Sequence, residues 1–315
     1  MKNKVSFMIL LEQKAEYLKQ ESGVEGVYKV IEKAARTCYK SEAKCDGTVE
    51  GAKAFVERMI KSHHTAMLES CSVYLKCYRN FEYEKNTGMV ERPSDLEFYA
   101  TNKYSKFNLD KDYNYVTTNL RVLVENNRLD DLNYWSEPTD MHEKRYTFRL
   151  VTDRAIANEI VRHRLFSFAQ ESTRFVDYSN EKYGTDIAYI MPDWFPNATL
   201  QQQEAFMQMM KDTEDLYFAL RGKWDERKPD KRFKTGFKDN PLTPQQARAV
   251  FPLCLKTELC ITGYVTDWRF FLDLRLFGKT GKPHPQIVEL SEKIVEQMKE
   301  AGIYESVINA KSKFD

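Results

Sequence analysis

The spacing of apolar residues along the chain predicts a series of helices and strands. Over residues 27–38, apolar side chains recur every three or four positions, which indicates an amphipathic helix. A second helix is expected to follow, with Thr48 as its N-cap. Apolar residues at every second position indicate strands over residues 5–11, 73–78 and 145–151.

Residues 80–143 interrupt this regularity, because they are polar and rich in Asn, Asp and Tyr, with one short helical pattern at residues 120–124. We interpret this segment as an insertion or a lid. The rest of the chain predicts, in order, a long helix over residues 206–220, a basic connection over residues 221–241, a strand around residues 255–261 and two final helices. There is neither a regular strand–helix alternation nor an internal repeat. The sequence therefore predicts one α+β domain over residues 1–315, in which helices flank an antiparallel sheet and a polar insertion occupies about residues 80–143.

The balance of charges excludes some classes of partner. With 48 basic and 47 acidic residues, the chain has no overall field that would attract nucleic acid or an anionic membrane, and we expect neither as a partner. No apolar run is long enough to cross a bilayer, and no signal-peptide cleavage pattern follows the first residues, which predicts a cytoplasmic protein. The six cysteines form no CxxC pair and the five histidines no HExxH motif. We therefore expect neither a metal site nor a disulfide framework.

The segment RHRLFSFAQESTRF, residues 162–175, gathers charge and aromatic surface in one place. Thr152 is expected to cap a helix that ends in the RHR triplet. On that helix Arg164 shares a stripe with Ile156 and Ile160, and an arginine that faces the core needs an anion. Two interpretations stay open. The segment is either a site for a ligand with a planar ring and an anionic group or a structural cluster of cations at a helix C-terminus.

A similar question concerns Arg275. Thr266 is expected to cap its helix, in which Arg275 ends an apolar stripe formed by Trp268, Phe271 and Leu272. A buried guanidinium should meet a carboxylate, a ligand or a pocket. The alternative is an arginine that snorkels from the helix end into solvent. By pattern alone, Arg248 is expected to be a surface residue of a helix.

A specific motif adds to these patterns, because Arg162, His163, Arg164 and Ser172 stand in the register RHR-x7-S. This register resembles the signature of the flavin-dependent thymidylate synthases. The likeness extends over about residues 20–290 and includes AARTCYKSE, HTAMLES, TTNLRVLVEN, QESTRF, ARAVFP and a WR-x5-R pattern that ends at Arg275.

The resemblance implies a fold, a reaction and a set of site residues. It implies an α+β homotetramer with active sites between subunits, which methylates dUMP reductively to dTMP with FAD, NADPH and methylenetetrahydrofolate. The positions that would bind FAD are His64, Thr65, Ala66, Arg162, His163, Arg164, Gln170, Tyr264, Thr266 and Phe270. The positions that would bind dUMP are Glu159, Arg162, Gln170, Glu171, Ser172, Thr173, Arg174, Arg248 and Arg275.

Arg275 matches the arginine credited in that family with activating dUMP. Loss of the uracil N3 proton pushes electron density toward C5, and a guanidinium stabilises this anion better than water does. Carbon C5 then becomes the nucleophile, and no cysteine thiolate is needed. We expect Cys254 to be a core residue, because it lies on an alternating strand without an activating histidine. Ser172 has no obvious base beside it, so we assign it to binding.

Some positions depart from the family pattern. Ala66 stands where the family usually has Ser or Thr, Ser70 where it has His, and Tyr264 and Phe270 where Asn or His is common. At such positions FAD can still contact the backbone.

Two other functions stay open. One is a relative that transfers a hydroxymethyl group to a pyrimidine nucleotide, because both reactions begin with the same C5 nucleophile. The other is a nonenzymatic phosphate or nucleic-acid binding module built on the RHR cluster and the basic residues 221–238.

Overall fold

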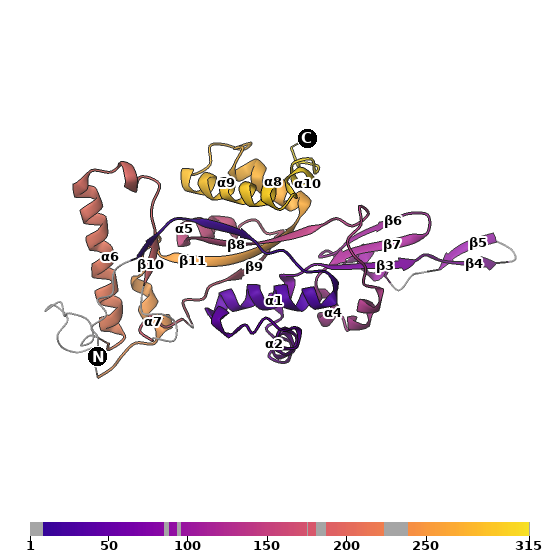
Figure 1. Ribbon diagram of the computed structural model, residues 1–315, viewed down its shortest axis with the longest axis horizontal. Coiled ribbons are helices and arrows are strands. Elements are labelled where there is room, and N and C mark those ends of the chain that lie inside the picture. Colours follow the sequence, from indigo (N-terminus) through magenta and orange to yellow (C-terminus); the bar gives the residue numbers. More distant parts are fainter. Residues whose placement is uncertain are drawn as a thin grey trace.

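A four-stranded antiparallel sheet forms the centre of the computed structural model, which describes residues 9–84, 88–92, 96–174, 176–180, 187–223 and 239–314. Its strands, in spatial order, are β2 (Lys14–Tyr17), β8 (Arg145–Asp153), β11 (Lys256–Tyr264) and β9 (Ser167–Gln170) (Figure 1). The register sets Leu259 of β11 opposite Leu150 of β8 and Gln170 of β9. The strand that follows the RHR triplet is therefore an edge strand of this sheet.

Helices cover both faces of the central sheet (Figure 1). One face carries α1 (Gly23–Tyr39) and α2 (Val49–Lys61), and the other carries α5 (Arg154–Ile160), α8 (Val265–Arg275), α9 (Pro285–Glu300) and α10 (Tyr304–Ile308). The alternation of side chains along β11 explains this arrangement. Leu259 and Ile261 are buried with Trp268 of α8, whereas Cys260 is buried in the cluster that contains α1. The expected α+β fold with an antiparallel sheet is confirmed.

A second antiparallel sheet lies at one end of the molecule (Figure 1). It consists of β3 (Val73–Tyr78), β7 (Tyr113–Thr118) and β6 (Lys106–Leu109), and the hairpin of β4 (Asn80–Glu84) and β5 (Gly88–Arg92) projects beyond it. Two short helices belong to this part, α3 (Phe98–Thr101) and α4 (Leu120–Glu125). Val116, Leu120 and Leu123 are buried in the same cluster as α1. Residues 113–124, part of the segment interpreted as an insertion or a lid, therefore belong to the core.

A third group of elements lies at the opposite end of the molecule, where β1 (Ile9–Leu11) pairs in parallel with β10 (Ala188–Ile190). The long helix α6 (Leu200–Leu220) and the short α7 (Pro244–Ala247) accompany this pair (Figure 1). Tyr189, Met210, Tyr217 and Leu255 form its buried cluster. Residues 5–8 of the predicted first strand and residues 224–238 of the basic connection lie outside the described residues. Over the described ranges, no helix combines the length and apolarity needed to span a membrane.

The predicted start of one helix is confirmed, and those of two others are wrong. Thr48 caps α2, because its hydroxyl accepts a hydrogen bond from the backbone N–H of Gly51 at 3.0 Å. Thr152 does not cap α5. It lies inside β8, opposite Thr257 of β11, since the sheet continues two residues further than the alternation indicated. Asp153 is the cap instead and accepts the N–H of Ile156 at 2.7 Å.

The start of α8 also differs from the prediction. Thr266 lies inside the helix, which begins at Val265 with Tyr264 as the N-cap. The carboxylate of Asp267 accepts the backbone N–H of Tyr264 at 3.1 Å and so closes the first turn. The hydroxyl of Thr266 is free for a tertiary contact and donates to Glu143 at 2.5 Å.

Candidate active site

The RHR triplet follows α5 and is not part of the helix. The helix ends at Ile160, and the N–H of His163 returns to the carbonyl of Ile160 at 3.0 Å. This turn buries His163, which is 7% exposed, and leaves Arg162 and Arg164 exposed. The prediction that Arg164 faces the core is therefore wrong, because the helical stripe stops before it reaches that residue.

His163 lies in an aromatic environment and accepts a hydrogen bond from an arginine. The Nε of Arg275 donates to its Nε2 at 2.9 Å, and the ring of Phe271 lies 5.0 Å from the imidazole. Burial lowers the pKa of His163 to about 4, and the positive charges of Arg275 and Lys313 add to this effect. At neutral pH the imidazole is therefore uncharged. Its acceptor role at Nε2 assigns the ring proton to Nδ1.

The carboxylate expected as a partner of Arg275, which is half-buried, is supplied by Glu159. Nη1 of Arg275 lies 2.7 Å from Oε2 of Glu159, and Nη2 donates to the Glu159 carbonyl at 3.3 Å. Glu159 comes from the last turn of α5 and Arg275 from the last turn of α8. Three nitrogens of one guanidinium are thus engaged, which fixes the orientation of its plane. Of its five N–H donors, two stay available to another anion.

The segment from Gln170 to Arg174 leaves the edge strand and is held mainly by internal contacts. Gln170 donates to Thr257 at 3.3 Å, and the N–H of Ser172 donates to the carbonyl of Cys38 at the end of α1 at 3.2 Å. The hydroxyl of Thr173 accepts from Arg248 at 3.2 Å. The side chains of Arg174 and Arg248 are exposed, as expected for Arg248 from the sequence pattern.

Glu171 is the buried anion of this segment and is only 2% exposed. Lys256 lies 3.1 Å from its carboxylate, and the hydroxyl of Tyr178 donates to it at 3.3 Å. Burial disfavours the charge of Lys256, but Glu171 and Glu258 outweigh this and raise the pKa of Lys256. Lys256 is therefore charged at neutral pH, and its pair with Glu171 holds the segment against β11.

Two further cations near Glu171 were not predicted as site residues. Arg154 donates to the carbonyl of Glu171 at 3.3 Å, and burial lowers the pKa of its guanidinium. Lys40 follows α1 in the left-handed conformation and lies over the ring of Tyr178 at 5.2 Å. The sequence held a signal for Arg154, because a basic residue in the first turn of a helix opposes the helix dipole and needs another reason to be there.

The predicted segment at residues 64–66 lies beside the C-terminal end of α1. Nδ1 of His64 is 3.2 Å from the hydroxyl of Tyr39, and Thr65 donates to Glu125 at 2.7 Å. His64 and Ala66 are exposed, so this segment presents one imidazole and its backbone to solvent.

The predicted cofactor positions in and before α8 differ in exposure. The hydroxyl of Tyr264, a buried residue, donates to the carbonyls of Thr117 and Tyr104 at 3.0 and 3.1 Å, so it is already engaged. The ring of Phe270 is half-buried and stacks on Phe314. Of these two residues, only Phe270 has a face near the surface.

The predicted site residues are divided between the two faces of the sheet. Glu159, His163 and Arg275 meet between α5 and α8. Ser172 is bonded to the end of α1, which covers the opposite face, and His64 contacts the same helix end. Within one chain, Arg275 and Ser172 therefore contact helices on opposite faces of the sheet (Figure 1).

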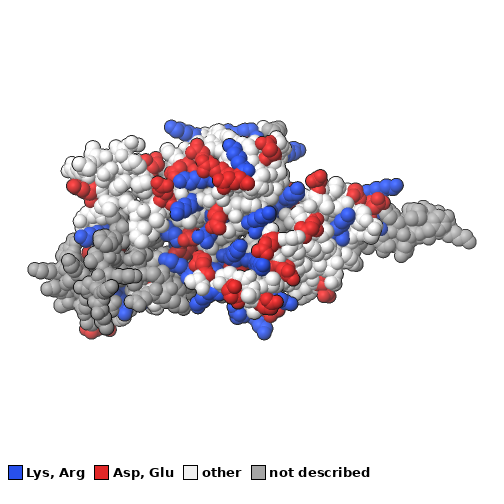
Figure 2. Space-filling model, viewed as in Figure 1, with Lys and Arg blue, Asp and Glu red and all other residues white. Residues whose placement is uncertain are grey.

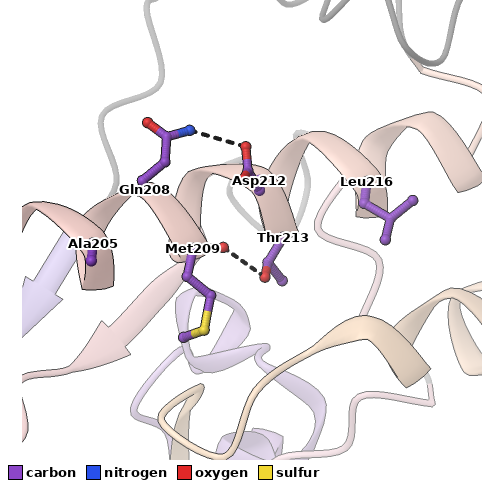
Figure 3. A pocket seen from close by; sticks show the side chains of 6 residues that line it. All are labelled: Ala205, Gln208, Met209, Asp212, Thr213 and Leu216. Carbon is purple, nitrogen blue, oxygen red and sulfur yellow. Dashed lines mark hydrogen bonds between the residues drawn. The ribbon is translucent and has the colours of Figure 1, made fainter.

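A separate pocket lies along α6 (Figure 3). It is lined by Ala205, Gln208, Met209, Asp212, Thr213 and Leu216. Gln208 donates to Asp212 at 3.0 Å and Thr213 to the carbonyl of Met209 at 2.9 Å. None of the lining residues is a predicted site residue.

The family model described as "Thymidylate synthase complementing protein" matches residues 136–301, slightly more than half of the chain. The chain belongs to this family. The matched residues include Glu159, the whole RHR-x7-S motif and Arg275, so the family model covers both helices that carry the cluster around His163. The resemblance to the flavin-dependent thymidylate synthases is thereby confirmed.

The sequence matches to individual relatives cover a smaller part of the chain. The flavin-dependent thymidylate synthase of Corynebacterium efficiens is 30% identical over 125 residues, which are 39% of this chain and 45% of the relative. That of Corynebacterium glutamicum is 31% identical over 127 residues, with the same shares. The matched region thus spans about half the length of these curated relatives.

Solved structures resemble the chain over nearly its whole length but only distantly. The UMP/dUMP methylase PolB from Streptomyces cacaoi, bound with 5-Br dUMP, has a TM-score of 0.43 and 13% identity over 96% of this chain and 97% of that one. Thymidylate Synthase X from Helicobacter pylori, with FAD and dUMP, has a TM-score of 0.37 and 12% identity over 94% and 99% of the two chains. The family assignment rests on the family model and not on these structures.

Proposed function

We propose that the chain is a flavin-dependent thymidylate synthase of the cytoplasm that methylates dUMP reductively to dTMP. Methylenetetrahydrofolate would donate the carbon, and NADPH would supply reducing equivalents through FAD. The observation that carries this proposal is the hydrogen bond between Arg275 and His163, which joins the WR-x5-R and RHR motifs across 112 sequence positions. A purely structural arginine would not require both family motifs to converge on it.

Arg275 would activate the substrate. Its guanidinium is fixed by His163 and Glu159 and keeps two N–H donors for a planar anion. Directed at the uracil ring, these donors would stabilise the N3-deprotonated form, so that C5 gains the electron density it needs as a nucleophile. Uncharged His163 adds no competing positive charge and holds the guanidinium in place.

The residues present fit a dinucleotide cofactor in charge and in aromatic surface. Exposed Arg162 and Arg164 can pair with phosphate groups, and Phe270 offers a ring face. His163 and Tyr264 are buried and engaged, so they would act by holding their neighbours and not by polar contact with FAD. His64, Thr65, Ala66, Gln170 and Thr266 complete the proposed cofactor positions. When bound, FAD supplies the two-electron chemistry that the amino-acid side chains lack.

The phosphate of dUMP would be bound by the cations near Glu171. Arg154, Arg174, Arg248 and Lys40 provide positive charge there, whereas Lys256 is neutralised by Glu171 and Glu258. Ser172 and Thr173 would add hydroxyl groups, and the buried ion pair of Glu171 would keep this segment rigid.

Substitution of Arg174 by alanine tests the phosphate site. We expect the dissociation constant for dUMP to rise about tenfold, because one charge-assisted hydrogen bond is lost, while flavin content and thermal stability stay close to those of the wild type. Titration calorimetry of the flavin-loaded protein measures the change. Lys223→Ala, which removes an exposed cation at the end of α6, is the matched control. Equal dUMP affinities of the Arg174 variant and the wild type would refute the assignment.

The complete site would form between copies of the chain. Because Arg275 and Ser172 lie toward opposite faces of the sheet, a second copy must approach if both are to contact one nucleotide. This supports the homotetramer with shared sites that the family resemblance implies.

No cysteine nucleophile is needed in this mechanism. Burial raises the pKa of Cys254 to about 11, and its sulfur lies 3.5 Å from that of Met210, so the thiol is protonated, and the half-buried residue packs against the core cluster of Met210. Cys254→Ala should therefore keep kcat within about twofold of the wild type. A steady-state assay of dTMP formation measures this, and loss of all turnover in a folded variant would restore a thiolate mechanism.

The two alternative functions give different products and charge distributions. A hydroxymethylase would convert dUMP to hydroxymethyl-dUMP, and mass spectrometry of the product distinguishes this from dTMP. A nucleic-acid binding module would need a field of one sign, but on the face shown in Figure 2 acidic and basic side chains are interspersed over the central part of the molecule. Formation of hydroxymethyl-dUMP without dTMP would overturn the proposed reaction.

A further inference from the structure

The residues after α10 form a strap that is hydrogen-bonded to α8. We define the C-terminal strap as residues 309–314, which lie beyond the region matched by the family model. The hydroxyl of Ser312, itself buried, donates to the carboxylate of Asp273 at 2.5 Å and accepts the N–H of Phe314 at 3.1 Å. Asp273 is completely buried and also pairs with Arg269 at 3.2 Å. The strap is therefore held at one defined point.

This anchoring sets two strap side chains against Phe270, one of the proposed cofactor positions. The ring of Phe314 stacks on that of Phe270 with centroids 5.8 Å apart and 22° between the planes. Nζ of Lys313 lies 4.3 Å from the centroid of the same ring. The ring centroid of Phe270 also lies 6.2 Å from that of His163. The strap thus borders the cluster of His163 and Arg275.

The cations around Phe270 differ in how their charges are compensated. Arg269 and Lys279 share the carboxylate of Asp273, and Arg275 pairs with Glu159. Lys313 forms no ion pair among the residues that the structure describes, and its ammonium lies over a ring. Its charge adds to burial and Arg275 in lowering the pKa of His163, and it opposes the rise that burial causes in the pKa of Asp267. In the described part of the chain the ammonium thus has no direct ion pair and remains available to a ligand anion.

We propose that the last two described residues of the strap are part of the cofactor site, with Lys313 binding a phosphate group of the dinucleotide and Phe314 extending the aromatic wall of Phe270. This inference rests on the proposed function for the class of cofactor. The ammonium of Lys313, an exposed residue, is weakly held over this ring, so it can turn to a phosphate oxygen at little cost.

The test compares Lys313→Met with the wild type, since methionine keeps most of the side-chain length and removes the charge. The dissociation constant of FAD is measured on full-length apoprotein by quenching of flavin fluorescence, and that of dUMP by calorimetry on the FAD-saturated protein. We expect FAD to bind about tenfold more weakly and dUMP to bind with unchanged affinity. Lys311→Met makes the same change elsewhere on the strap and should leave both constants unchanged. Lys313→Arg should restore FAD affinity to within about twofold of the wild type.

The possible outcomes separate this inference from the proposed function. If the wild type binds FAD and Lys313→Met binds it equally well, the strap only covers α8 and the inference is wrong. If Lys313→Met weakens dUMP and not FAD, the inference is also wrong, because the cation then serves another ligand. A wild type that binds no FAD contradicts the proposed function itself. Weaker FAD binding by Phe314→Leu, at an unchanged thermal midpoint, would further support the aromatic wall.

Discussion

Replacing Arg275 by lysine is expected to lower kcat for dTMP formation by about 10²- to 10³-fold while the chain still folds. The guanidinium holds His163 through Nε and Glu159 through both Nη atoms, and it keeps two donors for the uracil ring. An ammonium is a single point of charge. It can pair with Glu159 or face the substrate, but it cannot do both in a fixed plane. Steady-state kinetics at saturating dUMP measure the effect, with circular dichroism to verify the fold.

The matched control for this substitution is Arg128→Lys. Arg128 pairs with Asp131 at 2.6 Å, remote from α5 and α8, so the same chemical change there should keep kcat within about twofold. If Arg275→Lys also retained kcat within about threefold, Arg275 would not be the residue that activates dUMP.

The second large effect concerns acid stability and originates at His163. Its pKa is lowered to about 4 in the folded chain, by burial first and then by Arg275 and Lys313, against a usual value of 6.5. Between pH 6.5 and pH 4 the imidazole of His163 is mostly protonated in the unfolded chain and mostly neutral in the folded chain. This residue's contribution is therefore complete above pH 6.5 and is lost as the pH falls toward 4. Between pH 7 and pH 5 the loss amounts to about 2 kcal/mol.

Urea unfolding at pH 7 and pH 5, at one protein concentration, measures this term. His163→Gln keeps an acceptor for Arg275 but has no proton to gain, so its stability should fall by about 2 kcal/mol less than that of the wild type over this interval. His63→Gln, a substitution of an exposed histidine, should follow the wild type. If all three proteins lost equal stability between pH 7 and pH 5, His163 would not be a buried neutral group.

Local pattern predicted the elements whose two faces differ in polarity. α1 and α2 present one apolar stripe each, and β11 alternates around Leu259 and Ile261, so the periodicity was sufficient. It failed for β7, where Asn114, Thr117 and Thr118 are buried together with Val116. Because β7 itself carries polar side chains on both of its faces, its sequence shows no alternation of polarity. Such a sequence cannot be distinguished from that of a polar insertion.

The sequence could propose the candidate residues, but it could not supply their geometry. The spacing RHR-x7-S identified Arg162, His163 and Arg164, yet periodicity assigned the inward direction to Arg164, because it could not indicate that α5 stops at Ile160. The pairing of Glu159 with Arg275 spans 116 positions and depends on two helices meeting at their C-terminal ends. The sequence marked Arg154 only by its unfavourable position in the first turn of α5, and Lys40 could be found only once Glu171 was known to be buried near it.

The central claim is that this chain binds a flavin and uses it to reduce a methylene group on dUMP, and the visible absorbance of the purified protein tests it most directly. Reconstituted with FAD, the protein should show the oxidised flavin spectrum, lose it when NADPH is added without oxygen, and regain it with dUMP and methylenetetrahydrofolate as dTMP appears. A protein that stays colourless with excess FAD, or whose flavin is bleached and reoxidised without any dTMP, would contradict the account.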